Sequence, residues 1–343
     1  MFGLNFFSQQ PQWTVSSIPD LSGRVAIVTG GNTGLGYITV RELARKGARV
    51  YMLSRTDTRA FAAMDKIKGE LGPELNPQVE YINFDLLSLN SAKKAADTFL
   101  QKEKRLDILV NNAGIMATPY ELGPDGIEIQ ASNGTGHFAL TISLLPLLKT
   151  TAAMPDSHVR IVNVSSFGYF FAYAASKPDF SSLEGLNQKT WTTWVRYGRS
   201  KLMNILFTNE LQKRLTESGT NNIYCLSVHP GGVSTELTRG MKLHCPSSVS
   251  LKNIPPGPLQ SWPFLAPLDK FTRLFLATPE QGALTQLYAA TSLEVEEKDL
   301  KAALLSPVAQ VATKASLAED KDGKMGSDFW NLCEALMREK VRD

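Results

Sequence analysis

The stretch Thr29-Gly30-Gly31-Asn32-Thr33-Gly34-Leu35-Gly36 stands between an apolar run at residues 24–29 and an amphipathic run at residues 34–46. These runs predict a strand and a helix joined by a glycine-rich turn. Glycine permits a tight turn and lets backbone N–H groups approach a pyrophosphate, which the positive end of the following helix attracts. An ordinary glycine-rich turn is the alternative. The candidate contacts to such a ligand are Gly30, Asn32, Thr33, Gly34, Leu35 and Gly36.

Strand-like and helix-like runs alternate outward from this turn. The strand-like runs are continuously apolar, which is typical of a parallel sheet with helices on both faces. The sequence therefore predicts an α/β fold with a Rossmann-type doubly wound parallel sheet. The further strands are expected at 49–53, 79–84, 108–110, 159–164 and 223–228, and the further helices at 59–71, 91–103, 128–149 and 195–214.

We expect one domain in three parts: an N-terminal arm at 1–20, a catalytic core at 21–240, and a C-terminal part at 241–343. Six prolines between 246 and 267 predict an irregular loop that covers the substrate. Helices at 281–291 and 329–340 are expected to pack on the same domain, whereas residues 294–321 give no clear pattern. The apolar arm is expected to pack on its own domain, with peripheral contact to a membrane surface as the alternative.

Composition excludes several classes of function. The chain has 343 residues, 43% of them hydrophobic, and a net charge of +3, which does not indicate a nucleic-acid partner. Three cysteines without a CxxC spacing, and histidines without a metal-ligand spacing, argue against a disulfide framework and a metal site. They favour a reducing, cytoplasmic location. No apolar run is long enough for a transmembrane segment.

The end of the second strand indicates the cofactor. Ser54 and Arg55 occupy the position where an acidic residue would favour NAD. An arginine there can pair with the 2′-phosphate of NADP(H), and the Ser54 hydroxyl can hydrogen-bond to it. A solvated surface arginine is the alternative for Arg55, and the nearby Asp57 weakens the argument.

Two more strands end in residues suited to the adenine ring. Asp85 and Leu86 follow the third strand, and the Asp85 carboxylate can accept a hydrogen bond from the adenine amino group. A helix cap is the alternative for Asp85. The run Asn111–Gly114 follows the fourth strand, and its members Asn112, Ala113 and Gly114 are candidate cofactor contacts, with asparagine side chains bracing neighbouring strands.

Tyr197 and Lys201 are four residues apart on an expected helix and so share one face. An ammonium close to the phenol is expected to lower the pKa of Tyr197 toward neutrality. A serine hydroxyl at the end of the fifth strand, Ser165 or Ser166, can hold a substrate carbonyl oxygen. Asn133 lies in a helix that is poor in helix formers, and His137 is expected to be a packed residue rather than a catalytic one.

These motifs resemble the short-chain dehydrogenase/reductase family, in particular its retinol dehydrogenase-like and WW-domain-oxidoreductase-like branch, which includes fungal biosynthetic reductases. The resemblance covers about residues 21–237 and rests on the TGxxxGxG turn, the NNAG loop, the YxxxK pair, and the stretches RIVNVSS and VHPGGVSTEL. It implies catalytic roles for Asn133, Ser166, Tyr197 and Lys201. Pro230, Gly231, Val233 and Thr235 would contact the nicotinamide end of the cofactor.

By this resemblance Tyr197 is the general acid in reduction, and Ser166 holds the carbonyl oxygen. Lys201 binds the ribose, and Asn133 anchors a water that links Lys201 to solvent. Relatives often form dimers or tetramers through their two long helices, so a homo-oligomer is left open. The sequence departs from the branch at Gly134 and Thr135, where relatives have His-Leu, and shows no N-terminal membrane anchor.

Aromatic residues gather near the expected catalytic strand end, at 167–173, at Trp191 and Trp194, and at Trp262 in the proline-rich loop. They favour an apolar pocket for a lipophilic partner. The expected function is NADP(H)-dependent interconversion of a carbonyl and an alcohol on a lipophilic small molecule, with a secondary-metabolite intermediate as one candidate. A non-catalytic NADP-binding regulatory protein, and an NADP-dependent epimerase or double-bond reductase, are the alternatives.

Overall fold

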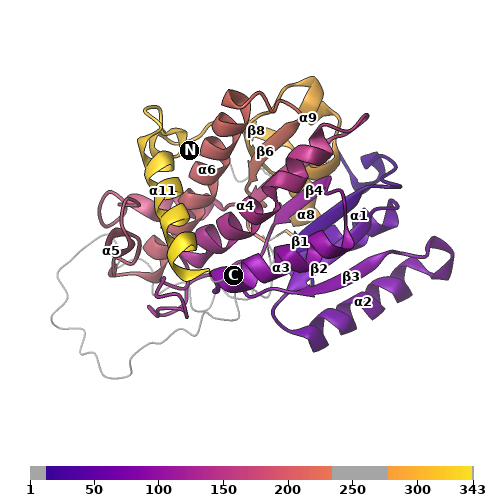
Figure 1. Cartoon of the computed structure of the whole chain (residues 1–343), viewed down its shortest axis with the longest axis horizontal. Coiled ribbons are helices and arrows are strands. Elements are labelled where there is room, and N and C mark those ends of the chain that lie inside the picture. Colours follow the sequence, from indigo (N-terminus) through magenta and orange to yellow (C-terminus); the bar gives the residue numbers. More distant parts are fainter. Residues whose placement is uncertain (1–12, 234–276, 342–343) are drawn as a thin grey trace.

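A computed structural model describes residues 13–233 and 277–341, and its core is one eight-stranded sheet in the order β3-β2-β1-β4-β5-β6-β7-β8 (Figure 1). All neighbouring strands run parallel except β7 and β8, which are antiparallel. The strands are β1 (Val25–Thr29), β2 (Arg49–Ser54), β3 (Val79–Asn83), β4 (Ile108–Asn111), β5 (Val159–Val164), β6 (Ile223–Val228), β7 (Leu304–Ser306) and β8 (Gln310–Ala312).

Helices cover both faces of the sheet, and each face has its own apolar core. One core packs α3, α4, α6 and α11 against the sheet, and the other packs α1, α2 and α8 against the opposite face. The long helices are α1 (Gly34–Arg45), α2 (Asp57–Leu71), α3 (Leu89–Lys102), α4 (Ser132–Ala152), α6 (Thr193–Glu217), α8 (Pro279–Thr291) and α11 (Lys324–Lys340). The short ones are η1 (Val15–Ser17), η2 (Pro73–Leu75), η3 (Phe167–Tyr173), α5 (Leu183–Leu186), α9 (Glu294–Glu297) and α10 (Ser316–Glu319).

The strand order reverses direction between β1 and β4. After β3 the chain returns to the middle of the sheet and adds strands on the other side of β1. In such sheets the loops at the carboxyl ends of the strands separate at this reversal and leave a crevice for a ligand. The predicted Rossmann-type doubly wound sheet is therefore confirmed, and it places the glycine turn after β1 at the mouth of this crevice.

The structure corrects the expected C-terminal part in one respect. Residues without a clear pattern in the sequence form β7 and β8, so this segment extends the sheet in addition to supplying helices. The proline-rich stretch 246–267 lies outside the described residues. At the other end, Trp13 is 6% exposed and packs edge-to-face on Tyr288 of α8, with ring centroids 5.6 Å apart. Trp13 and Ile18 are thus buried on the domain, whereas residues 1–12, with most of the apolar residues of the arm, lie outside the described residues.

Within residues 13–233 and 277–341, we find no helix long and apolar enough to cross a membrane.

Candidate active site

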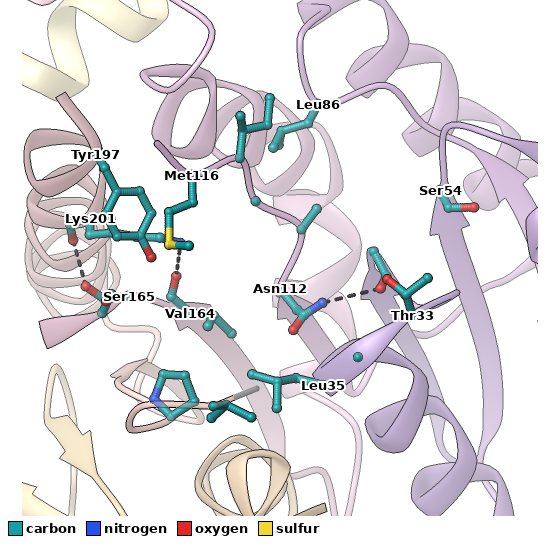
Figure 2. A pocket seen from close by; sticks show the side chains of 18 of the residues that line it. Thr33, Leu35, Ser54, Leu86, Asn112, Met116, Val164, Ser165, Tyr197 and Lys201 are labelled. Carbon is teal, nitrogen blue, oxygen red and sulfur yellow. Dashed lines mark hydrogen bonds between the residues drawn. The ribbon is translucent and has the colours of Figure 1, made fainter. Parts of the chain in front are cut away.

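A cavity of about 790 Å³ runs along the carboxyl ends of the central strands (Figure 2). It extends from Ser54 at one end, past the glycine turn, to Tyr197 and Lys201 at the other. Eighteen residues predicted from the sequence line it: Gly30, Asn32, Thr33, Gly34, Leu35, Ser54, Arg55, Asp85, Leu86, Asn112, Ala113, Gly114, Ser166, Tyr197, Lys201, Pro230, Gly231 and Val233.

Three predicted site residues stand apart from this lining. Thr235 lies outside the described residues. Gly36 is a packing residue rather than a ligand contact, because a Cβ there would lie 2.2 Å from the Gly30 carbonyl oxygen and 2.5 Å from Asn112 Nδ2. Asn133 is fully buried behind the cavity wall. Gly30 itself has φ +65°, a conformation that favours glycine, so both glycines are required for the shape of the turn.

Thr29 joins the glycine turn to the NNAG loop. Its hydroxyl oxygen accepts hydrogen bonds from the backbone N–H groups of Asn112 and Ala113, both at 2.9 Å. It also lies 2.9 Å from His137 Nε2. The other nitrogen of the same ring, Nδ1, lies 2.9 Å from the Asn133 carbonyl oxygen. A carbonyl only accepts, so Nδ1 carries the proton and Thr29 donates to Nε2. Burial lowers the pKa of His137 to about 3, so the ring is neutral and structural, as predicted.

The asparagines brace the strands as expected. Asn111 Nδ2 donates to Asn163 Oδ1 on β5 at 2.8 Å and to Thr141 on α4 at 2.9 Å. Asn112 Nδ2 donates to the Thr29 carbonyl oxygen at 2.8 Å. These side-chain bonds tie β1, β4 and β5 together at the edge where the cavity opens, so the loop that lines it has a fixed path.

The end of the cavity near β2 holds a buried polar group. Ser54 lines the cavity, and its Oγ has no hydrogen-bond partner among the residues that the structure describes. Buried hydroxyls are normally paired, so this atom suits a ligand oxygen. Arg55 is exposed at the rim, and Arg59 of α2, which we did not predict, lines the same end. Asp57 begins α2, and its carboxylate accepts from Thr58 N–H.

Asp85 is not the helix cap that the sequence left open. The cap of α3 is Ser88, whose hydroxyl accepts from Ser91 N–H at 3.2 Å. Asp85 Oδ1 instead accepts from Leu87 N–H at 3.0 Å, which fixes the carboxylate in a tight turn on the cavity wall. This position is compatible with the predicted contact to adenine.

Tyr197 and Lys201 lie side by side on α6 and are 4% and 3% exposed. The Lys201 ammonium lies 5.7 Å from the Tyr197 ring centroid and donates to the Val164 carbonyl oxygen at 2.9 Å. Burial lowers the pKa of Lys201 to about 8. The expected lowering of the tyrosine pKa is not found. Burial raises the pKa of Tyr197, and only a hydrogen bond with Ser166 opposes that increase.

The structure distinguishes the two serines. Ser165 is buried, and its hydroxyl donates to the Lys201 carbonyl oxygen at 2.8 Å, so it fixes α6 against β5. Ser166 faces Tyr197, and its hydroxyl accepts from Gly168 N–H at 3.0 Å at the start of η3. A Cβ on Gly168 would lie 2.8 Å from the Tyr197 ring, so this backbone packs against the phenol. Of the two serines, Ser166 is therefore the one whose hydroxyl lies beside the Tyr197 phenol.

Asn133 supports the loop at Ile115 rather than facing the cavity. Its side chain accepts from Ile115 N–H and donates to the Ile115 carbonyl oxygen, both at 2.8 Å, and donates to Ser200 Oγ at 2.9 Å. A methyl group at Gly114 would lie 3.7 Å from Asn133 Oδ1 and 3.6 Å from Lys201 Nζ. Gly114 therefore separates the amide from the ammonium.

Sequence reasoning missed two side chains that hold the site. His229 Nδ1 accepts from Phe167 N–H at 3.1 Å and Gly231 N–H at 3.3 Å, which links η3 to the turn after β6, and burial lowers its pKa to about 4. Gln286 of α8 donates to Thr39 of α1 at 2.5 Å. Gln286 belongs to no short motif, and His229 lies in the stretch VHPGGVSTEL without any local sign of this role, so only the fold reveals both roles. Met116 and Thr118 also line the cavity and were not predicted, whereas Phe171 and Trp194 belong to the aromatic residues expected near the pocket.

Comparisons with known proteins show the family of this chain. The family model described as short chain dehydrogenase matches residues 24–180. An uncharacterised oxidoreductase of Schizosaccharomyces pombe is 40% identical over 304 residues, 88% of this chain and 81% of that protein. Retinol dehydrogenase 12 of Mus musculus is 36% identical over 318 residues, 92% of this chain and 87% of that protein. An uncharacterised protein from Mycobacterium paratuberculosis has a solved structure with a TM-score of 0.66 and 32% identity, covering 95% of this chain and 97% of that one.

The chain therefore belongs to the short-chain dehydrogenase/reductase family of oxidoreductases, whose members use nicotinamide cofactors. Its relatives include retinol dehydrogenases and fungal short-chain dehydrogenases.

Proposed function

We propose that this protein is an NADP(H)-dependent oxidoreductase that interconverts a carbonyl and an alcohol on a lipophilic small molecule. The observation that carries the proposal is the continuity of one cavity. Ser54, Arg55 and Arg59 line one end, and Ser166, Tyr197 and Lys201 line the other. A dinucleotide laid along the glycine turn would join the two ends.

The residues present fit NADP(H). The unpaired Ser54 hydroxyl and two arginines near it supply a donor and positive charge for a 2′-phosphate. Gly30 and the first turn of α1 offer backbone N–H groups to the pyrophosphate. The Lys201 ammonium is placed for the nicotinamide ribose, and the bound cofactor would supply the hydride.

Ser166 and Tyr197 would bind the substrate carbonyl oxygen between their hydroxyl groups. As hydride reaches the carbonyl carbon, negative charge develops on that oxygen, and the Tyr197 hydroxyl donates its proton there. Lys201 would stabilise the resulting phenolate, since an ammonium favours the charged form of a neighbouring acid. We propose that Asn133 supports the return of a proton through Lys201, by holding Ile115 and so the backbone at Gly114.

The substrate side of the cavity favours an apolar compound. Met116, Phe171 and Trp194 line it beside Tyr197. Apolar walls with few polar groups fix a ligand mainly by burying its surface, and the two hydroxyl groups then select a carbonyl or an alcohol. A lipophilic aldehyde or ketone matches both features.

The experiment is oxidation of NADPH by the purified protein, with decanal, trans-1-decalone and trans-2-decenal as probes and NADH as the comparison cofactor. The proposal predicts an alcohol product and lower KM for NADPH than for NADH. Epimerisation would yield a product without net cofactor consumption, and a double-bond reductase would leave the carbonyl intact. Tight NADPH binding without turnover of any probe would favour the non-catalytic alternative and contradict the proposed reaction.

A further inference from the structure

We propose that Glu128, Gln130 and Arg196 are positioning residues that hold the loop 115–118 as the wall of the substrate site and so set which carbonyl compounds fit. This inference rests on the proposed function and deepens it. None of the three residues belongs to the motifs described above, and none of them lines the cavity.

The wall they hold has no regular structure of its own. Ile115, Met116 and Thr118 line the cavity, and Figure 2 shows Met116 beside Tyr197. Ala117 has φ +53°, a conformation that costs free energy for a residue with a Cβ. A loop with such a backbone keeps one shape only when its surroundings fix it.

Side chains, and not backbone partners, fix this loop. Gln130 Oε1 accepts from Ala117 N–H at 2.9 Å, and Arg196 Nη2 donates to the Thr118 carbonyl oxygen at 2.9 Å. Asn133 makes the two bonds to Ile115 already described. Among the described residues, every backbone hydrogen bond of residues 115, 117 and 118 is made with the side chain of Asn133, Gln130 or Arg196.

The arginine is itself held by a buried ion pair. Arg196 Nε donates to Glu128 Oε1 at 3.1 Å, and the two side chains are 6% and 2% exposed. The other carboxylate oxygen of Glu128 accepts from the N–H groups of Gln130 and Ala131, at 3.0 and 3.1 Å. Burying both charges is costly unless geometry and further hydrogen bonds compensate, so such a pair is weak evidence for stability alone. A role in fixing a specific geometry accounts for it better.

The connectivity explains why this geometry concerns the reaction. Arg196 directly precedes Tyr197 on α6, and Glu128 and Gln130 directly precede α4, which carries Asn133. The ion pair therefore joins α6, which carries Tyr197, to the segment before α4, which supports the loop 115–118. The distance between the Tyr197 hydroxyl and the wall depends on this connection, and that distance limits the width of the compound that can approach.

Two variants test the proposal. Gln130→Leu removes the bond to Ala117, and the double variant Glu128→Gln with Arg196→Met removes both buried charges together, so that no unpaired charge remains. The control is Glu296→Gln with Arg160→Met, a second ion pair with a buried arginine, placed at the other end of β5 from the site. The probes are butanal and trans-1-decalone with NADPH.

We expect the ratio of kcat/KM for trans-1-decalone to that for butanal to change about tenfold in both test variants, mainly through KM. The Kd for NADPH should stay within about twofold of wild type, since the cofactor end is untouched. The control variant should lose thermal stability and keep the wild-type ratio. An unchanged ratio in both test variants, or an equal change in the control, would overturn the proposal.

A second readout separates this proposal from the proposed function. If wild type reduces neither probe, the proposed function fails on that result, and hydrogen exchange then tests the wall. Peptides that contain residues 115–118 should exchange faster in Gln130→Leu and in the double test variant than in wild type or the control. Unchanged exchange in both would contradict the assignment of these residues as supports of the wall.

Discussion

Lys201 is a charged side chain in a position that water scarcely reaches. Within residues 13–233 and 277–341, its ammonium donates to the Val164 carbonyl oxygen and forms no ion pair with a carboxylate. Burial lowers its pKa to about 8 from 10.5, so the folded protein holds this proton less tightly than the unfolded chain does. A position that costs stability in the absence of ligand is typical of a functional group.

Replacing Lys201 by Met should therefore stabilise the ligand-free protein. Between pH 8 and pH 10.5 the unfolded wild type binds more protons, so its free energy of unfolding rises with pH. Below pH 8 the variant avoids the full cost of the buried charge, roughly 3 kcal/mol, and the gain should vanish as the pH approaches 10.5. In the variant the Val164 carbonyl oxygen loses its bond from Lys201 but still accepts a hydrogen bond from Asn204 Nδ2 at 2.9 Å, so it is not left unpaired.

Urea denaturation of both proteins at neutral and alkaline pH measures this difference. A variant less stable than wild type at neutral pH would contradict the account of Lys201. Lys314, whose pKa burial also lowers to about 8, is present in both proteins and gives the same pH dependence to each. The difference between the two curves thus isolates Lys201.

Arg55→Asp should reverse the proposed preference for NADPH. On the proposed function it would remove a charge-assisted hydrogen bond to the 2′-phosphate and set a carboxylate in its place, so the Kd for NADPH should rise about 10- to 100-fold. The Kd for NADH should stay level or fall, because a carboxylate can accept from a 2′-hydroxyl. Fluorescence titration checks both values. Lys68→Asp, an exposed position on α2 away from the cavity, is the control. An equal rise of the Kd for NADPH in both variants would show that the loss of positive charge, and not a contact of Arg55, causes the effect.

At the scale of elements, α11 determines which surface of the long helices is free. It packs across α4 and α6, and Trp330 lies with its ring centroid 5.0 Å from that of Phe138 and 6.1 Å from that of Phe207. Arg214 of α6 stacks over the same indole at 4.3 Å. The indole N–H donates to Glu334 at 2.8 Å, so both the apolar and the polar parts of the side chain have partners.

Trp330→Ala should thus cost about 3 to 5 kcal/mol of the free energy of unfolding, the usual range for deleting a buried aromatic side chain. Denaturant unfolding measures it. Phe61→Ala, at an exposed phenylalanine on α2, should cost far less and serves as the comparison. A cost as small as that of Phe61→Ala would show that α11 is only loosely attached.

At the scale of the whole molecule, the position of the C-terminal segment bears on the oligomeric state. Residues that continue the sheet and cover α4 and α6 come from the C-terminal segment, which we expected only to supply a loop and helices. Figure 1 shows α11 beside α6 and across the end of α4. A dimer that used the two long helices would have to displace α11 and expose its apolar face, which the hydrophobic effect opposes.

We therefore expect a monomer of 37.7 kDa in sedimentation equilibrium at micromolar concentration. A dimer under these conditions would contradict this expectation.

Local patterns predicted the strands β1 to β6 because each is a continuous apolar run next to a turn signal. They did not predict β7 and β8, which have three residues each and no period of their own. The predicted helix over 128–149 began too early. The Glu128 carboxylate accepts from Gln130 and Ala131 N–H, and the regular helix starts only at Ser132.

The candidate site likewise contains residues that the sequence could predict and residues that it could not. The glycine turn, the NNAG loop and the YxxxK pair are contiguous in sequence, so their chemistry was visible in the residues. Arg196 and Glu128 are 68 residues apart, and His229 acts through Phe167, 62 residues away. Such supports appear only when the fold brings distant segments together. The pKa of Tyr197 was also beyond sequence reasoning, since burial decides its direction.

The central claim is that Tyr197 supplies the proton when a carbonyl is reduced with NADPH. The most direct test compares wild type with Tyr197→Phe, using decanal, after titration has shown that both bind NADPH. The account predicts an intact fold, a Kd for NADPH within about twofold of wild type, and kcat lower by about a thousandfold. Near wild-type turnover by Tyr197→Phe would contradict it, and the proton donor would then have to be another group.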